Sequence, residues 1–269
     1  MSKSWIRDSG GTWRETLAMY IRDGGGTWRP IKQVWVNQSG VWRRVFGNPS
    51  SQTITTVGTT NIVVPAGCYT VNIDSYGGGG GSGGSVVGRT DMFSGQCRGQ
   101  NAAGGGSSGG YTNVTAMSVV PGTTITVTVG GGGTGGLYTT VVPGSPKGGT
   151  GGTGTPSKIT ISGVDYAVAA GGNGGQGPTI TNGSTLSSVG AGGAAPAGGV
   201  AGTAGLSTGG TNWDGQLLGT PGTGGVNTYG SGGNGYVNVD ANWGDGRNWC
   251  PSPQNGNPGA SGAVIITFP

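Results

Sequence analysis

Hydrophobic and polar residues alternate in several short stretches of the chain, and each stretch predicts a β-strand. Within Tyr69–Tyr76, valine and isoleucine alternate with asparagine and aspartate. Further strands are predicted at Asn113–Val119 and, after the turn Pro121-Gly122, at Thr124–Val129. A hairpin is predicted in which the strands Lys158–Ile161 and Asp165–Ala169 are joined by a turn at Ser162-Gly163. The pattern therefore predicts a small β-sheet made of short strands.

The last strand of the pattern is apolar throughout. Ala263–Phe268 reads AVIITF, and a continuous apolar run of this length predicts a strand in the middle of the sheet. We expect the first and last strands to lie side by side and close the domain. Residues 47–60, which precede the first apolar run, are interpreted as a linker that runs into a first strand.

Glycine runs with a period of three residues separate the predicted strands. GGTGGTGT and GGNGGQG flank the hairpin of residues 158–169. Similar runs close at Ser85 and Gly136 and cover residues 104–110, 190–205, 219–225 and 230–235. A polyproline II-like helix has about three residues per turn and no internal hydrogen bonds, so its backbone groups must pair with neighbouring segments. The runs therefore predict a bundle of packed polyglycine II helices, because paired glycines leave two bare edges on each helix.

The composition leaves two other interpretations to weigh. Collagen also has a glycine period of three, but its period is uninterrupted. The 67 Gly and 14 Pro residues among 269 also fit a disordered low-complexity chain. The strands between the runs and the dispersed aromatic residues favour a folded chain. Because only 32% of residues are apolar, backbone hydrogen bonds and close glycine packing must replace part of the side-chain burial.

Residues 1–46 contain a repeat with a period of 15 residues. Each unit begins with an aromatic residue, passes through a glycine-containing turn and ends in Trp-Arg, which predicts three β-hairpins. Turns centred on Ser9 and on Gln38-Ser39 would place Trp5 opposite Trp13 and Trp35 opposite Trp42. These residues are interpreted as the small core of a meander or as a pseudo-threefold cap for a trimer, and the two interpretations are compatible. The candidate attachment residues are Trp5, Trp13, Tyr20, Trp28, Trp35 and Trp42.

The charge distribution separates the two ends of the chain. Residues 1–45 hold eight of the 13 Lys and Arg residues and three of the nine Asp and Glu residues, a net charge of +5 against −1 for the rest. No basic stripe runs through the glycine-rich part, so nucleic-acid binding is not expected. We therefore divide the chain into an N-terminal hairpin-repeat domain, 1–50, and a glycine-rich domain, 51–269.

The sequence predicts neither an enzyme nor a cofactor or metal site. The chain has no histidine, which excludes His-based triads and zinc motifs, and no Gly-Lys-Ser/Thr phosphate loop. No apolar stretch is long enough for a signal peptide or a membrane span. Cys97 and Cys250 form either a disulfide or two free thiols.

Four landmarks of the glycine-rich part occur together in a fixed order. They are VPAG leading to GGGGG in Val64–Gly81, PG leading to VGGGG in Val119–Gly133, a hairpin leading to GGNGG in Ile159–Gly175, and SGAVIITF in Ser261–Phe268. With these landmarks, residues 55–269 resemble the glycine-rich domain of bacteriophage tail proteins, and the many Gly-Gly-X runs resemble the distal-tip adhesins of T-even-like long tail fibres. That resemblance implies a polyglycine II sandwich with variable loops and a small N-terminal domain on a trimeric fibre, although residues 1–46 depart from the T-even tips.

Inserts between the glycine runs carry the candidate binding residues. Trp, Tyr and Arg dominate binding hot spots because they give a large contact area at a low cost in side-chain entropy. The inserts are residues 86–101, 176–189, 210–218 and 236–258. Their candidate receptor-binding residues are Arg89, Asp91, Met92, Phe93, Arg98, Trp213, Asp214, Trp243, Asp245, Arg247 and Trp249. Alternatively, Trp243 and Trp249 fold inward and anchor their own loop.

From these observations we expect a phage adhesin at the distal end of the tail fibre in the virion. Residues 1–46 would bind a trimeric fibre protein, and the inserts would bind a bacterial outer-surface receptor, either an outer-membrane protein or lipopolysaccharide. A structural glycine-rich virion component is the alternative. An ice-binding polyglycine protein is a further alternative, which the large aromatic inserts disfavour.

Overall fold

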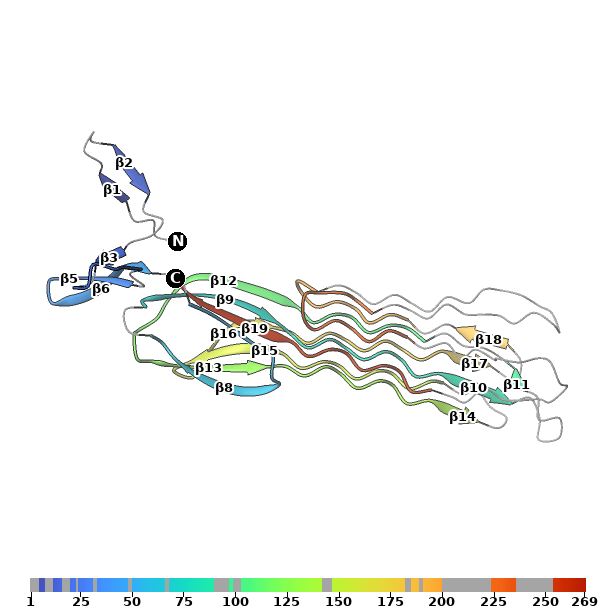
Figure 1. Cartoon of the computed structure of the whole chain (residues 1–269). Coiled ribbons are helices and arrows are strands. Elements are labelled where there is room, and N and C mark those ends of the chain that lie inside the picture. The colour runs from blue at the N-terminus through green and yellow to red at the C-terminus, as the bar shows by residue number, and fades with distance from the viewer. Residues whose placement is uncertain are drawn as a thin grey trace.

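The glycine-rich chain folds into an all-β structure with one end built from sheets and a long array of glycine segments extending from it (Figure 1). The computed structural model describes residues 5–7, 12–15, 20–22, 24–30, 33–47, 50–65, 68–89, 97–98, 103–141, 147–181, 185–188, 191–199, 224–235 and 254–269. Within these ranges every regular element is a strand, which confirms the predicted fold class of mostly β and irregular structure.

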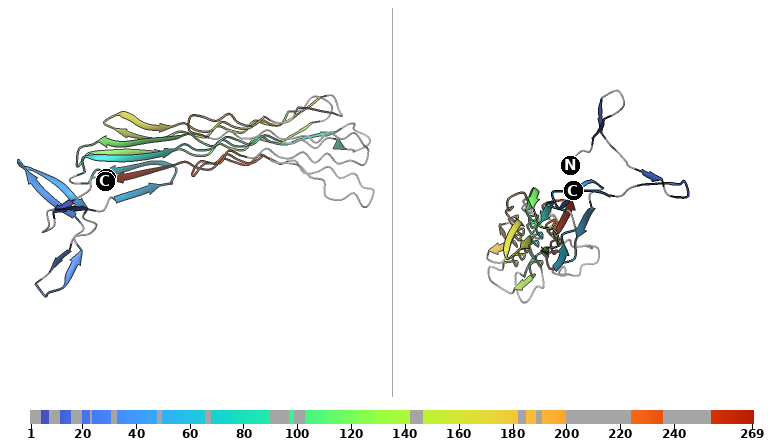
Figure 2. Two further views of the ribbon diagram at one scale, coloured as in Figure 1. Left: turned by 90° about the horizontal axis from the view of Figure 1, so that it is seen from above. Right: turned by 90° about the vertical axis from the view of Figure 1, so that its left-hand side faces the viewer.

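The N-terminal repeat forms three antiparallel hairpins, as its period predicted. They pair β1 (Trp5–Arg7) with β2 (Trp13–Glu15), β3 (Tyr20–Arg22) with β4 (Trp28–Pro30), and β5 (Gln33–Gln38) with β6 (Val41–Gly47). The left view of Figure 2 shows these hairpins at the sheet end of the molecule, beside the C-terminus.

The predicted pairing of the tryptophans is wrong. Trp13 lies opposite Arg7 and Trp42 lies opposite Asn37, because each turn is centred one residue further along the chain than predicted. In the third hairpin Ser39 and Gly40 adopt φ angles of 54° and 86°, as a two-residue type I′ turn requires. The Asn37 Oδ1 atom accepts the N–H of Gly40 at 2.9 Å and fixes this turn.

Two four-stranded antiparallel sheets face each other at one end of the glycine array. The first has the order β12 (Tyr111–Ser118), β9 (Thr70–Tyr76), β19 (Ala263–Phe268) and β7 (Ser50–Ile54). The second has the order β16 (Val164–Ala169), β15 (Ser157–Ile161), β13 (Thr124–Val129) and β8 (Gly58–Val63). The predicted interior position of the last strand, β19, is confirmed.

The interpretation of residues 47–60 as a linker is wrong. Most of this range belongs to β7 and to the start of β8, the edge strands of the two sheets. Edge strands of serine and threonine residues carry little hydrophobic periodicity, since most of their side chains are exposed. The alternation of hydrophobic and polar residues in the sequence therefore did not indicate these two strands.

The inner faces of the two sheets enclose the hydrophobic core. Alternate residues of β9, β13 and β19 point into it, as the alternation in their sequences predicts. The largest fully buried side chains on these three strands include Phe268, Ile73, Ile125 and Ile266. The core ends where the strands run into the glycine segments.

The glycine array is organised around residues 77–85, here called the central segment. The N–H groups of Gly77, Gly80 and Gly83 donate to residues 103–110, at 2.9–3.0 Å. Those of residues 78, 81 and 84 donate to residues 147–156, and those of residues 79, 82 and 85 donate to residues 254–262. This rotation with a period of three is the hydrogen-bonding pattern of a polyglycine II helix, which confirms the predicted fold of the glycine runs.

The carbonyl groups of the central segment bind three further segments. Gly78 and Gly81 accept hydrogen bonds from residues 170–178, Gly79 and Ser82 accept from residues 130–137, and Gly80 accepts from residues 230–235. The central segment therefore has six hydrogen-bonded neighbours, three that accept its N–H groups and three that donate to its carbonyls. Figure 2 shows these segments from above as rods running side by side away from the sheets.

Glycine is required in the central segment because its neighbours leave no room for a Cβ atom. At each of its seven glycines, an added Cβ would lie 2.0–2.2 Å from a carbonyl oxygen of a neighbouring segment. Ser82 and Ser85 interrupt the glycines, and their hydroxyl oxygens accept the N–H groups of Asn257 and Gln254 at 2.7 and 2.9 Å. These serines therefore bind the backbone that passes beside them.

Two predicted boundaries of the glycine array need correction. Residues 254–258, predicted to belong to an insert, lie in the array, where Gly256, Gly259 and Gly262 occupy every third position. The predicted run 190–205 contains a turn at residues 197–198, where Gly198 has a φ of 70°. Single glycines with a period of three are thus sufficient for a segment at the edge of the array.

Candidate functional site

The end of the array opposite the sheets is here called the distal end, and it carries the inserts between the glycine segments (Figure 1). Four inserts have described segments on both sides, 86–102, 138–146, 179–190 and 236–253, and each joins a segment that runs away from the sheets to one that returns. The predicted insert 210–218 lies outside the described residues. The flanking segments are hydrogen-bonded neighbours in each case, for example Gly83 N–H to Gly104 O at 3.0 Å and Gln176 N–H to Ala191 O at 2.8 Å. The two ends of every insert are therefore held close together.

Strand pairing connects the first insert to the second, and the third insert to the start of the segment 147–156. β10 (Val86–Arg89) lies between β11 (Cys97–Arg98) and β14 (Thr139–Val141) in a three-stranded sheet, and its pairing with β14 is parallel. β17 (Thr179–Thr181) and β18 (Thr185–Ser188) form a hairpin within the third insert, and Lys147 bridges to Thr179. The described part of the distal end is thus a connected β-structure rather than a set of separate loops.

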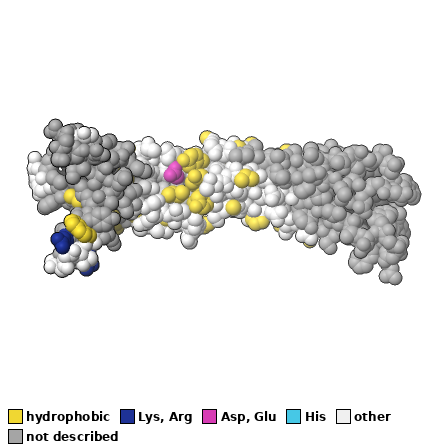
Figure 3. All heavy atoms as spheres, turned by 45° about the horizontal axis from the view of Figure 1, so that its top comes forward, with side chains coloured by type: hydrophobic (Ala, Val, Ile, Leu, Met, Phe, Trp, Pro, Cys, Tyr) yellow, Lys and Arg dark blue, Asp and Glu magenta, His cyan; other side chains and the backbone are white. Residues whose placement is uncertain are grey.

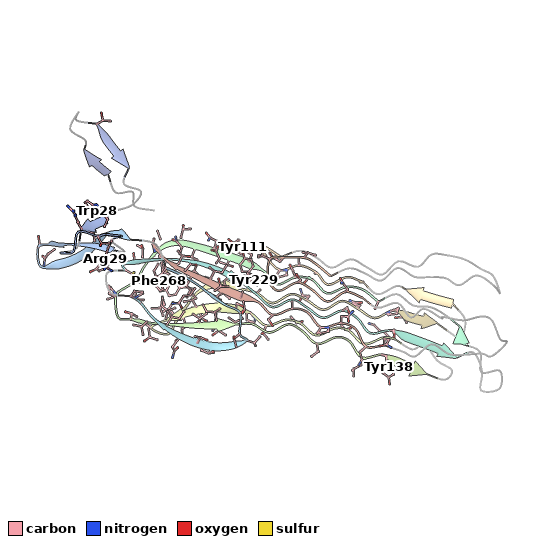
Figure 4. All side chains as sticks on the ribbon, in the orientation of Figure 1. Trp28, Arg29, Tyr111, Tyr138, Tyr229 and Phe268 are labelled. Carbon is pink, nitrogen blue, oxygen red and sulfur yellow. The ribbon has the colours of Figure 1, made fainter. Side chains whose placement is uncertain are left out.

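Two large side chains are exposed where the segment 130–137 meets its insert. Leu137 is 70% exposed and Tyr138 is 46% exposed, and Figure 4 shows Tyr138 near the distal end. The Tyr138 N–H donates to Asn255 Oδ1 at 3.0 Å, which connects the second insert to the segment 254–262. This Leu-Tyr pair was not among the predicted binding residues, although two large residues directly after a glycine run were a usable signal.

The structure places only part of the predicted binding set. Arg98 pairs with Gly88, the neighbour of Arg89, so the two arginine positions lie on adjacent strands of the three-stranded sheet. The other predicted receptor-binding residues lie outside the described residues: Asp91, Met92, Phe93, Trp213, Asp214, Trp243, Asp245, Arg247 and Trp249. Cys250 also lies outside them, so its pairing with Cys97 stays a prediction.

All six predicted attachment residues fall in strands of the three hairpins. Trp28 is 65% exposed, so it does not belong to a buried core of the repeat. The Arg22 Nε–H donates to Gly26 O at 3.1 Å and closes the turn next to this tryptophan. The second hairpin therefore presents an aromatic surface that no described residue covers.

Charged groups of the sheets form local pairs that do not converge on one site. Lys158 Nζ and Asp165 Oδ2 are 2.7 Å apart, and this hydrogen bond, together with one from Thr160, lowers the pKa of the Asp165 carboxyl. The hydrogen bond that Tyr111 donates to Asp74 raises the pKa of the tyrosine to about 12. Among the described residues, no group of three or more His, Cys, Asp or Glu side chains is placed to bind a metal ion. No helix suited to cross a membrane occurs in the same ranges.

The fold and the distal end define a class of all-β proteins in which a glycine array carries inserts away from a small β-sandwich. Within that class, the chain belongs to the glycine-rich domain family, whose match covers residues 54–269. No curated protein matches the chain significantly. The matched range is nearly the same as residues 55–269, the part in which the four sequence landmarks occur.

Proposed function

We propose that the chain is a receptor-binding adhesin at the tip of a phage tail fibre. The observation that carries the proposal is the separation of the two ends of the molecule. The described hairpins and the C-terminus lie at the sheet end, whereas the described strands of the inserts, β10, β11, β14, β17 and β18, lie together at the distal end (Figure 1). A protein that attaches through one end and recognises a target through the other needs this arrangement.

The glycine array is suited to hold the inserts at a fixed distance and orientation. Every N–H group from residue 77 to residue 85 donates a hydrogen bond to a neighbouring segment. Binding loops placed on a rigid scaffold are a common arrangement, because the loops vary while the scaffold keeps its geometry. The inserts begin and end on neighbouring segments, so their sequences can change without moving the array.

The partner at the sheet end is proposed to be a trimeric tail-fibre protein. Three similar hairpins offer three similar surfaces, which suits a partner with threefold symmetry. Their exposed Trp28 and the net charge of +5 on residues 1–45 give the contact both an apolar and a basic component. The resemblance to long-tail-fibre tips supports the same assignment.

The partner at the distal end is proposed to be a bacterial outer-surface receptor, either an outer-membrane protein or lipopolysaccharide. The described candidates for contact are Leu137 and Tyr138, which are exposed, and the arginine positions of β10 and β11. Insert 236–253 adds Trp243, Arg247 and Trp249 in sequence. A structural virion component would use the same inserts only for packing.

Binding of the labelled full-length protein to bacterial strains tests this function. The panel contains hosts of the parent phage, mutants that lack single surface proteins, and mutants with truncated lipopolysaccharide. We expect binding to the hosts and loss of binding in one mutant class, which identifies the receptor. Absence of binding to every host would favour the structural alternative.

A pair of variants assigns the binding to the distal end. Replacing residues 240–250 with a Gly/Ser sequence of equal length should abolish binding to the hosts. The control carries Val120→Ser and Val164→Ser at the sheet end, where these side chains are 68% and 54% exposed, and it should bind like the wild type. Loss of binding only in the control would contradict the proposal.

Co-purification with the fibre protein tests the attachment end. The triple variant Trp13→Ala, Trp28→Ala and Trp42→Ala should lose co-purification while it still binds host cells. Unchanged co-purification would show that the hairpins do not form the fibre contact.

A further inference from the structure

Three tyrosine rings gather where the first sheet meets the glycine array. Tyr111 of β12 and Tyr76 of β9 lie opposite each other in the strand register, with ring centroids 4.8 Å apart. Tyr229 packs on Tyr76 edge to face at 5.3 Å. We call Tyr76, Tyr111 and Tyr229 the tyrosine cluster; Figure 4 shows Tyr111 and Tyr229 close together, far from the distal end.

A carboxylate and an amide lie beside the tyrosine cluster on the same face of the sheet. Asp74 Oδ1 accepts hydrogen bonds from the Tyr111 hydroxyl and from Asn113 Nδ2, each at 2.7 Å. Asp74 Oδ2 accepts no hydrogen bond from a described residue. The hydroxyls of Tyr76 and Tyr229 donate no hydrogen bond within the described part of the chain. Figure 3 shows an acidic side chain beside a band of hydrophobic side chains in the middle of the molecule.

The turn that carries Tyr229 is held in place by its own hydrogen bonds. Ser231 Oγ donates to Asn227 O at 3.2 Å, and Asn227 Nδ2 donates to Gly109 O at 3.4 Å. Gly230 adopts a φ of 65° at the end of the turn, which favours glycine. The tyrosine cluster is therefore a preformed surface between two parts of the chain that are distant in sequence.

The ring distances decide which ligand fits this surface. An aromatic cage for a quaternary ammonium ion needs rings around a central space, because the cation lies over the ring faces. Rings at 4.8 and 5.3 Å are in contact with each other and leave no such space. The available surface is instead the exposed part of the Tyr111 side chain, which is 37% exposed and bordered by hydrogen-bonding groups.

We propose that the tyrosine cluster, with Asp74 and Asn113, is a saccharide-binding site separate from the distal end. The apolar face of a pyranose ring stacks on the exposed part of Tyr111. Its hydroxyl groups donate to Asp74 Oδ2 and exchange hydrogen bonds with the tyrosine hydroxyls and the Asn113 amide. Small-molecule sites commonly combine aromatic surface with a few polar groups that fix the orientation of the ligand.

This site would give the molecule a second contact with a glycan-covered surface, at its middle rather than at its tip. It does not depend on the receptor that the distal inserts bind. A protein partner fits this surface less well, because three rings and two polar side chains make an area far smaller than the about 800 Å² per partner of a typical interface.

Saturation-transfer difference NMR on the full-length protein tests the proposal. The probes are the methyl pyranosides of glucose, galactose, mannose and N-acetylglucosamine. We expect transfer to the ring C–H protons of at least one glycoside, together with shifts of the ring signals of Tyr111 and its neighbours in protein with ¹³C-labelled tyrosine. If no glycoside shows transfer, or if the tyrosine signals do not move, the proposal is wrong.

Matched variants separate a binding role from a structural one. Tyr111→Leu should weaken binding about tenfold or more because the aromatic ring is lost, whereas Tyr111→Phe should stay within about threefold of the wild type. Tyr166→Leu is the control, since Tyr166 is similarly exposed at 39% but lies on β16. Asp74→Asn should weaken binding to an intermediate degree.

Two outcomes with these variants would overturn the proposal. If Tyr111→Leu lowers the melting temperature but leaves glycoside binding unchanged, the tyrosines serve only to fasten the turn to the sheet. If replacing residues 240–250 removes the signal while Tyr111→Leu keeps it, the saccharide binds at the distal end. The tyrosine ring shifts of the wild-type protein decide the question even where a variant fails to fold.

Discussion

The β-sandwich and the glycine array of this chain are stabilised in opposite ways. In the sandwich, side chains such as Phe268 and Ile73 fill the space between two sheets, and the backbone pairs within each sheet. In the array, seven glycines of the central segment have neighbouring carbonyl oxygens where a Cβ atom would lie, so the backbone itself fills the space. One region depends on side-chain volume and the other on its absence.

This difference predicts opposite responses to changes of side-chain size. Removing volume from the sandwich leaves a cavity, whereas adding a methyl group to the array forces segments apart. Each segment of the array is also bonded to several others, so a local displacement disturbs more than one row of hydrogen bonds. Paired substitutions in the two regions test the comparison directly.

Truncation of the largest core side chain should have the largest effect. Phe268 is fully buried on β19, and Phe268→Ala should lower the free energy of unfolding by about 3–5 kcal/mol. Chemical denaturation followed by circular dichroism measures the change. Phe268→Leu is the control and should lose much less, since it keeps most of the volume; equal losses would show that the side chain does not fill the core.

A single added methyl group should be nearly as harmful in the array. In Gly80→Ala the new Cβ would lie 2.1 Å from the carbonyl oxygen of Asn173, and we expect a loss of about 3 kcal/mol. The control is Gly131→Ala in another segment, where the nearest atom would be Val57 Cγ1 at 3.4 Å. It should change stability by less than about 0.5 kcal/mol. Similar losses in both variants would contradict the close-packed arrangement.

The strands and glycine segments with a regular repeat were predictable from the sequence. The hairpin of β15 and β16 turns at Ser162-Gly163, whose φ angles of 50° and 82° fit a type I′ turn, and β19 lies inside its sheet. The Gly-Gly-X period predicted the polyglycine II geometry, because a helix with about three residues per turn places every third residue along one edge. These features depend on local periodicity, which the sequence displays directly.

Features that depend on which segments become neighbours were not predictable. Residues 254–262 have only single glycines, and their place in the array follows from their hydrogen bonds to the central segment. The tyrosine cluster joins Tyr76, Tyr111 and Tyr229 from distant parts of the chain, and nothing in the sequence marks them as neighbours. The exposed Leu137 and Tyr138 are different, because two large residues directly after a glycine run were visible in the sequence, and only their place near the distal end required the structure.

A smaller effect is expected at the boundary of the two regions, where a side chain serves the backbone of the array. The buried hydroxyl of Ser157 accepts the N–H of Gly130 at 2.9 Å, so Ser157→Ala should cost about 1–3 kcal/mol by leaving a buried donor unpaired. Ser75→Ala is the control, because the buried Ser75 hydroxyl has no hydrogen-bond partner in the part of the chain that the structure describes. Its removal should be neutral or stabilising. A larger loss for Ser75→Ala would mean that packing rather than hydrogen bonding determines both sites.

The smallest effect concerns the tyrosine that links the sheet to the tyrosine cluster. The hydrogen bond to Asp74, followed by partial burial and the charge of Asp74, raises the pKa of Tyr111 to about 12 from its usual value near 10. Because the protonated phenol is favoured in the folded state, this contribution to stability is complete below pH 10 and is lost as the pH rises through the folded-state pKa.

Titration of protein with ¹³C-labelled tyrosine, followed by NMR, should show Tyr111 as a late-titrating signal. Asp74→Asn should return its pKa toward 10, whereas Asp165→Asn on the other sheet should leave it unchanged. If Asp74→Asn does not lower this pKa, the carboxylate is not the group that holds the tyrosine, and the polar side of the proposed saccharide site would have to be reassigned.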